Sequence, residues 1–244
     1  MSFLADAVHP GTSEAAWRTE LSTRPPGRLV LADVPRAVVV APHPDDEVLA
    51  VGGLLRHLHR RGTELVVVAV TDGEGSHTDQ PALTVRAMRE REVLAAYGAL
   101  DIAPARHTLS LPDGAVAASE AALVDALRRV LRPDDLVLAP WEHDGHPDHD
   151  SAGRAALCAA DDTGATLLAY PVWAWHWAQP GGRDLPMHRA RLHPLDDVDL
   201  RAKAQAVVAF TSQLTPRTGP SPDPVLPAPV LARFARPFEV VLEP

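Results

Sequence analysis

The sequence predicts an α/β protein in which helices cover both faces of a mostly parallel sheet, a three-layer sandwich. Three observations carry this prediction. Short β-branched runs alternate with longer helical patterns, turn residues such as Gly62 separate them, and 244 residues are enough for one large domain. Alternation of strands and helices implies right-handed crossovers and therefore parallel strands. The expected fold is Rossmann-like.

The first strand is expected over residues 37–41, a β-branched apolar run of the kind that a buried parallel strand requires. A helix is expected over 47–61, because apolar residues recur at helical spacing from Val48 to Leu58. The same reasoning predicts strands over 65–70, 107–111, 136–139 and 166–172, helices over 83–97, 120–131 and 150–160, and then a helix over 200–210 and a strand over 237–242. In the common strand order 3-2-1-4-5, the first and fourth strands are neighbours at the switch point where ligands bind.

Two parts of the chain are less regular. Residues 1–35 are mixed in character and interrupted by prolines, and we expect an N-terminal extension that packs on the core or covers an edge. Residues 36–244 are expected to form a single domain. The stretch 216–229 is rich in proline and predicts a surface loop.

The composition disfavours several classes of partner. The net charge is -9 and the pI is about 5.7, with scattered basic residues, which argues against nucleic acid and an anionic membrane as partners. Cys158 is the single cysteine, and its apolar neighbours predict a packed thiol. The N-terminus lacks a basic segment followed by an apolar one, and no segment approaches ~18 consecutive apolar residues. We therefore expect a soluble, cytoplasmic protein with a neutral or cationic small-molecule substrate.

Two clusters of His and Asp follow two neighbouring strands of the expected sheet. One is His43-Pro44-Asp45-Asp46-Glu47 after the first strand, and the other is His146-Pro147-Asp148-His149 after the fourth. A catalytic zinc ion takes three protein ligands and keeps one position for water, whose pKa falls to roughly 7. His43, Asp46 and His149 can converge on one such ion. A lone His-x-x-Asp is more often a turn with a capping aspartate, so the prediction depends on the pair of motifs.

The two motifs resemble those of the zinc-dependent PIG-L/LmbE-like N-deacetylase family, which has P-H-P-D-D-E or A-H-P-D-D-E after the first strand and H-x-D-H later. Both match here without a gap. The resemblance implies the same three ligands for zinc, although ferrous iron also suits His and Asp. It implies that Asp45 is the general base, that His146 donates to the developing oxyanion or to the leaving amine, and that Asp148 fixes the tautomer of His146.

Further matches extend the resemblance over 37–213. Asp113 lies in a P-D-G turn, and Arg89 belongs to an R-x-x-E pattern whose arginine holds substrate hydroxyls in family members, so the resemblance implies substrate-binding roles for both. The pattern usually ends in a glycine, here Gly98. Two residues outside the ligand set, His143 and Asp144, are expected to line the pocket mouth or to lie in an exposed loop.

These observations predict a zinc-dependent amidohydrolase acting on linear amides, with a small N-acylated sugar as substrate. The expected reaction is N-deacetylation of an N-acetylglucosamine-type conjugate. The alternatives are an amidase for a larger thiol-sugar or antibiotic conjugate, or a non-catalytic sugar-binding relative. A dinucleotide-binding protein is disfavoured, because no G-x-G-x-x-G follows the first strand. The alternating Trp173, Trp175 and Trp177 either offer stacking faces to a sugar or pack in the core.

Overall fold

The centre of the molecule is an eight-stranded sheet with the order β1-β7-β8-β6-β5-β2-β3-β4. The structure is a computed structural model that describes residues 11–218 and 222–244. The strands are β1 Gly27–Arg28, β2 Arg36–Ala41, β3 Glu64–Thr71, β4 Ala105–Leu111, β5 Leu136–Pro140, β6 Thr166–Tyr170, β7 Ala190–Pro194 and β8 Phe238–Leu242. Strand β8 is antiparallel to β6 and β7, and the other pairs are parallel. The mostly parallel α/β sheet is therefore confirmed.

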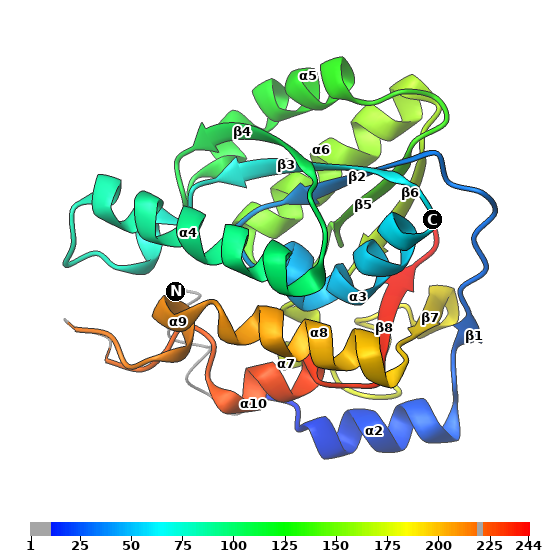
Figure 1. Cartoon of the computed structure of the whole chain (residues 1–244). Coiled ribbons are helices and arrows are strands. Elements are labelled where there is room, and N and C mark those ends of the chain that lie inside the picture. Colours follow the sequence, from blue (N-terminus) through cyan, green and yellow to red (C-terminus); the bar gives the residue numbers. More distant parts are fainter. Residues whose placement is uncertain (1–10, 219–221) are drawn as a thin grey trace.

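Helices cover both faces of this sheet (Figure 1). On one face lie α3 Asp46–Arg60, α4 Ala82–Leu100 and α8 Asp197–Val208, and on the other lie α5 Glu120–Val130 and α6 Pro147–Thr163. The shorter α-helices are α2 Glu14–Thr23, α7 Ala174–Trp177, α9 Thr211–Leu214 and α10 Ala228–Leu231. Four 3₁₀ helices are described: η1 Glu74–Ser76, η2 Val116–Ser119, η3 Met187–Arg189 and η4 Ala232–Phe234. The predicted three-layer sandwich is confirmed.

The core explains why the apolar runs form the central strands. Val38, Val39 and Val40 of β2 are all fully buried, because β3 and β5 flank this strand and helices cover its two faces. Strands β4, β3, β2, β5 and β6 reproduce the expected order 3-2-1-4-5. The loops after β2 and β5 thus leave the same edge of the sheet at its switch point.

Several helix boundaries differ from the prediction. Helix α6 begins at Pro147 and not at Asp150, because Pro147 occupies the first helical turn and His146 caps it. This start places His149 within the first turn. Helix α4 continues through Gly98 and ends at Leu100, where the capping residue Asp101 adopts the left-handed conformation (φ 55°).

The described N-terminal residues are part of the packed structure, because they contribute a buried side chain and an edge strand. Trp17 of α2 is fully buried, and β1 adds an edge strand beside β7. Neither β1 nor β7 was predicted, because β1 spans two residues and β7 contains Arg191, His193 and Pro194. Residues 1–10 of the expected extension, and 219–221 of the proline-rich stretch, lie outside the described residues.

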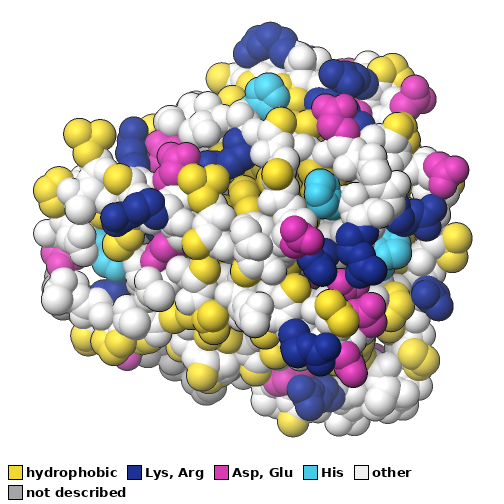
Figure 2. Space-filling model, in the orientation of Figure 1, with side chains coloured by type: hydrophobic (Ala, Val, Ile, Leu, Met, Phe, Trp, Pro, Cys, Tyr) yellow, Lys and Arg dark blue, Asp and Glu magenta, His cyan; other side chains and the backbone are white. Residues whose placement is uncertain are grey.

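The surface corrects one prediction. Cys158 is exposed, because it lies on the outward side of α6 while Ala155 and Ala156 face the core. Figure 2 shows Lys and Arg side chains spread over one face of the molecule and interleaved with acidic and hydrophobic ones. Within 11–218 and 222–244, none of the helices is both long enough and apolar enough to cross a membrane.

Candidate metal centre

Three side chains from the two predicted motifs meet beyond the ends of β2 and β5. His43 Nδ1, Asp46 Oδ2 and His149 Nε2 form a triangle whose three sides are each 3.2 Å. Neighbouring ligands of a tetrahedral ion at roughly 2.0–2.1 Å lie about 3.3 Å apart, so the spacing fits a zinc-like ion. His43 precedes α3, Asp46 begins it, and His149 lies in the first turn of α6.

Each histidine of this triangle has its other ring nitrogen beside a carboxylate. His149 Nδ1 donates to Asp144 Oδ2 at 2.8 Å, and both side chains are fully buried. His43 Nε2 lies 3.3 Å from Asp113 Oδ1 and 3.3 Å from Asp148 Oδ2. Outer carboxylates of this kind fix the tautomer of a metal-ligating histidine and raise its basicity. The donor set and its surroundings therefore fit a divalent cation.

A second group of donors shares one residue with the first. His43, His146 and Asp148 also bring three donor atoms within 4.8 Å of one another. The Asp148 carboxylate, however, already accepts the backbone N–H groups of Gly114 at 2.7 Å and Val116 at 3.1 Å. We therefore assign the ion to the triangle with Asp46, whose Oδ2 faces both histidines.

The buried carboxylates of the centre favour a positive charge on the groups between them. Although burial opposes it, the charge of Asp46 and the bond to Asp144 raise the pKa of His149 to about 9. Burial likewise lowers the pKa of His43, but its hydrogen bonds to the carboxylates of Asp113, Asp148 and Asp46 raise it well above its ordinary value. The protein without metal thus meets its buried carboxylates with imidazolium groups. A divalent cation bound by the neutral rings supplies the same charge and releases protons.

Asp45 lies beside the centre but outside the triangle. Its Oδ2 accepts a hydrogen bond from Arg89 Nη2 at 2.9 Å, while Asp46 turns toward the histidines. The two adjacent carboxylates therefore diverge, as the motif predicted. Burial raises the pKa of Asp45 and the charge of Arg89 opposes this rise. A buried carboxylate on the cavity wall is suited to accept a proton.

Arg89 makes contacts that the sequence did not predict. Its side chain is 2% exposed and donates from Nη2 to Asp45 and to the carbonyl of Pro44. Its Nε and Nη1 atoms are buried and have no hydrogen-bond partner among residues 11–218 and 222–244, and the residue lines the cavity. Arg89 therefore orients Asp45, and its remaining donors are available for a ligand in the cavity.

His146 lies against the other two histidines. Its ring centroid is 4.9 Å from those of His43 and His149. Burial, followed by the charge of His43, lowers the pKa of His146 to about 2, so its ring is neutral. Its Nδ1 accepts the backbone N–H of Asp148 at 3.2 Å, which leaves the ring proton on Nε2.

The contacts of Asp148 and Asp113 differ from those expected. We expected Asp148 to orient His146 from its carboxylate, but this carboxylate lies against His43 and is held by the backbone after β4. Asp113, expected to bind substrate, also lies against His43 and accepts from Gly75 N at 2.8 Å. Both acids therefore support a candidate ligand, and Asp113 in addition lines the cavity.

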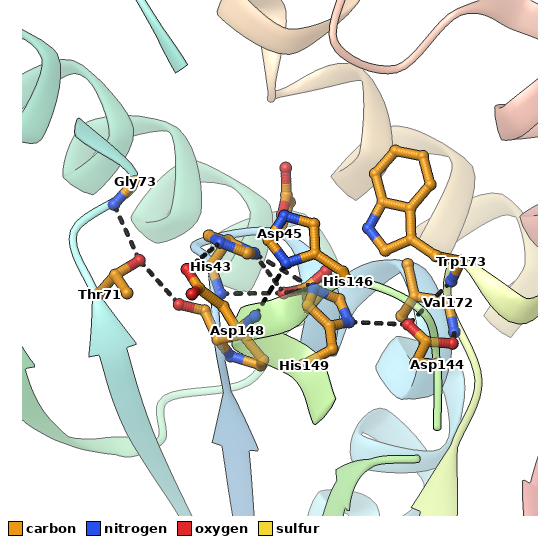
Figure 3. A network of polar contacts seen from close by, with 12 residues as sticks. His43, Asp45, Thr71, Gly73, Asp144, His146, Asp148, His149, Val172 and Trp173 are labelled. Atoms are coloured by element: carbon orange, nitrogen blue, oxygen red, sulfur yellow. Dashed lines mark hydrogen bonds and ion pairs between the residues drawn. The ribbon is translucent and has the colours of Figure 1, made fainter. Parts of the chain in front are cut away.

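Asp144 is the functional residue that the sequence analysis missed. We expected it at the pocket mouth or in an exposed loop, but it is fully buried, whereas His143 beside it is exposed. Its carboxylate accepts from His149 and from the backbone N–H groups of Val172, Trp173 and Ala174, each at 2.9 Å (Figure 3). The one available signal was an aspartate five residues before a predicted metal ligand.

A cavity of about 350 Å³ opens onto the centre. Its lining combines polar side chains, among them Asp45, Arg89 and Asp113, with apolar ones such as Trp173 and Leu226. Gln213 of α9 also lines it. Of the three tryptophans, Trp173 is part of the cavity wall, Trp175 is buried in the core, and Trp177 is partly exposed.

The fold and these side chains define a class, that of α/β proteins with a candidate metal centre at the switch point of a parallel sheet and a buried carboxylate beside it. The chain belongs to the PIG-L family. The family profile, described as GlcNAc-PI de-N-acetylase, matches residues 38–160, just over half of the 244 residues. The family predicted from the two motifs is therefore confirmed.

Individual relatives agree with this membership. The probable N-acetyl-alpha-D-glucosaminyl L-malate deacetylase 2 of Bacillus cereus is 30% identical over 133 residues, 50% of this chain and 59% of that protein. The 1D-myo-inositol 2-acetamido-2-deoxy-alpha-D-glucopyranoside deacetylase of Mycolicibacterium gilvum is 29% identical over 214 residues, 73% of this chain and 72% of that protein. The crystal structure of the A40926 pseudoaglycone deacetylase shares the fold, with a TM-score of 0.62 and 24% identity over 86% of this chain and 97% of that one. The chain thus spans less than two thirds of the Bacillus protein.

Proposed function

We propose that this protein is a zinc-dependent amidohydrolase that removes the acetyl group from an N-acetylglucosamine-type conjugate. The observation that carries the proposal is the triangle of His43, Asp46 and His149, with donor atoms 3.2 Å apart and the separate carboxylate of Asp45 beside it. The names of the Bacillus and Mycolicibacterium relatives support the reaction and the class of substrate. We further propose that residues 36–244 form one catalytic domain on which the N-terminal residues pack.

The proposed roles of the side chains follow from their contacts. A divalent ion held by His43, Asp46 and His149 supplies Lewis-acid activation of water and of the amide carbonyl. Asp45 takes a proton from the attacking water, and Arg89 holds the carboxylate in place. As the water oxygen bonds to the carbonyl carbon and the C–N bond breaks, Asp45 returns this proton to the leaving nitrogen.

His146 is proposed to stabilise the developing negative charge on the amide oxygen. Its neutral ring carries the proton on Nε2, because Nδ1 accepts from the backbone of Asp148. A neutral donor aimed at an oxyanion acts mainly in the transition state. This assignment favours the oxyanion over the leaving amine as the target of His146.

The mixed lining of the cavity supports an amino sugar as substrate. Arg89 and Asp113 offer polar groups for hydroxyls, and Trp173 offers an apolar face to the sugar ring. A larger thiol-sugar or antibiotic conjugate is the second candidate, because the A40926 pseudoaglycone deacetylase has the same fold.

The test is a substrate panel. The protein loaded with Zn²⁺ or Fe²⁺ is incubated with N-acetylglucosamine, its α-glycosides and bulky N-acylated glycosides, and release of the primary amine is measured. We expect turnover of N-acetylglucosamine glycosides that requires the metal. Turnover confined to bulky glycosides supports the second candidate, and binding without turnover supports a non-catalytic relative.

A further inference from the structure

The segment from Val172 to Ala178 contributes its first two residues to the wall of the cavity beside the candidate metal centre. Val172 and Trp173 line the cavity, and the Trp173 ring lies nearly parallel to that of His146, with centroids 6.4 Å apart and an interplanar angle of 24°. An indole ring is a large, flat and apolar surface. The placement of this segment therefore sets the width of the cavity beside His146.

The beginning of this segment is held from inside the protein. The carboxylate of Asp144 accepts three successive backbone N–H groups, those of Val172, Trp173 and Ala174. Figure 3 shows Asp144 between this backbone and the His149 ring. The contact fixes the N-terminal half of the wall to the metal centre.

The end of the segment is held by the N-terminal part of the chain. Thr12 donates from its backbone N to the His176 carbonyl at 2.8 Å, and from Oγ1 to the Ala178 carbonyl at 2.7 Å. Trp17 Nε1 donates to the Trp175 carbonyl at 2.8 Å. Three carbonyls of the segment are thus bound by two residues that lie about 160 positions earlier in the chain.

These contacts are close and enclosed. Trp17 is fully buried and meets the Trp175 ring edge to face, with centroids 4.9 Å apart. On the same Trp175 ring, at 4.4 Å from its centroid, lies the guanidinium of Arg236, which also pairs with Glu14 of α2 at 2.7 Å. The N-terminal residues and the segment 172–178 therefore form one packed unit around the Trp175 ring.

We propose that Thr12 and Trp17 are positioning residues of the substrate cavity. By holding the carbonyls of residues 175, 176 and 178, they keep Trp173 in the position that gives the cavity the width that the substrate requires. This inference rests on the proposed function. Neither residue touches the candidate metal ligands or Asp45 by any hydrogen bond or ion pair described here. Their loss is therefore expected to weaken substrate binding and to leave metal binding and the chemical step in place.

The test uses two conservative variants of the full chain. Thr12→Val removes the Oγ1 donor and keeps the shape and the backbone N–H, and Trp17→Phe removes the Nε1 donor and keeps an aromatic ring. We expect KM to rise roughly two- to tenfold, the range that one hydrogen bond supports, with kcat changed less than about twofold and metal content unchanged. Hydrogen exchange of the amides at 172–174 should become faster in both variants.

Leu21→Ala is the matched control, because Leu21 is buried on the same helix α2 and offers no donor to the segment. It should lower Tm at least as much as the other variants without changing KM or the exchange of 172–174. If Leu21→Ala raises KM equally, or if Thr12→Val leaves both KM and exchange unchanged, the positioning role is refuted. A wild-type protein that releases no amine refutes the proposed function instead, and the exchange rates still decide whether Thr12 holds the wall.

Discussion

Asp144 and His149 form a buried hydrogen bond of 2.8 Å in which the imidazole donates from Nδ1 and the carboxylate accepts. This bond turns Nε2 of His149 toward His43 and Asp46. Because the same carboxylate also holds the backbone at 172–174, it joins the candidate metal centre to the wall of the cavity. One side chain thus sets the geometry of both.

Asp144→Asn should weaken metal binding by roughly 10- to 100-fold, because an amide cannot accept from His149 and from the three backbone N–H groups with the same strength. The measurement is the Kd for Zn²⁺ by competition with a chelator. Asp150→Asn is the control. Asp150 lies in the same helical turn as His149, but its carboxylate accepts from the backbone N–H of Gly145. Equal loss of affinity in both variants would assign the effect to net charge alone.

The purified protein should contain about one divalent ion per chain, because the two groups of three donors among the described residues share His43 and can hold one ion between them. His43→Ala combined with His149→Ala should remove it, as measured by elemental analysis of the folded variant. His143→Ala, at an exposed position near the second motif, should keep full occupancy. Full occupancy in the double variant would exclude the triangle as the metal site.

The sequence predicted most of the sheet and the pair of motifs, but not the connections between distant residues. A β-branched run such as Val38-Val39-Val40 predicts a strand from its local sequence alone. The strand order then places His43 and His149 together, because they follow two neighbouring strands at the switch point. Asp144 lies in a turn whose local sequence is typical of a loop, and its backbone partners follow about 30 positions later. No local pattern predicts such a contact, and the same reasoning applies to Thr12 and Trp17.

Asp45→Asn should reduce kcat by roughly 10² or more and leave metal content nearly intact, because it removes a proton acceptor and keeps all three candidate ligands. Amine release and metal content are measured on the same preparation. Asp33→Asn, a fully exposed change at the surface, is the control for loss of one charge. A parallel loss of metal would make Asp45 a ligand and not a base.

His146→Ala should lower kcat far more than it raises KM, since one donor to an oxyanion contributes about 2.7–4 kcal/mol in the transition state. His146→Gln keeps a donor of similar reach and should recover part of this loss. An unchanged kcat in His146→Ala would exclude the role.

Asp148→Asn tests whether the carboxylate of Asp148 supports His146, as the resemblance implies, or His43, which it contacts. If Asp148 fixed the tautomer of His146, as the resemblance implies, the change would give a smaller defect of the same kind as His146→Ala. The carboxylate, however, lies 3.3 Å from His43 Nε2 and accepts two backbone N–H groups after β4. Its replacement should therefore weaken metal binding, because the ring of His43 loses an acceptor that fixes its tautomer. The Kd for Zn²⁺ and the kcat at saturating Zn²⁺ are measured together. We expect the affinity to fall and kcat to recover largely once the site is filled. A low kcat with normal affinity would instead return Asp148 to the support of His146, whose Nδ1 already accepts from the Asp148 backbone.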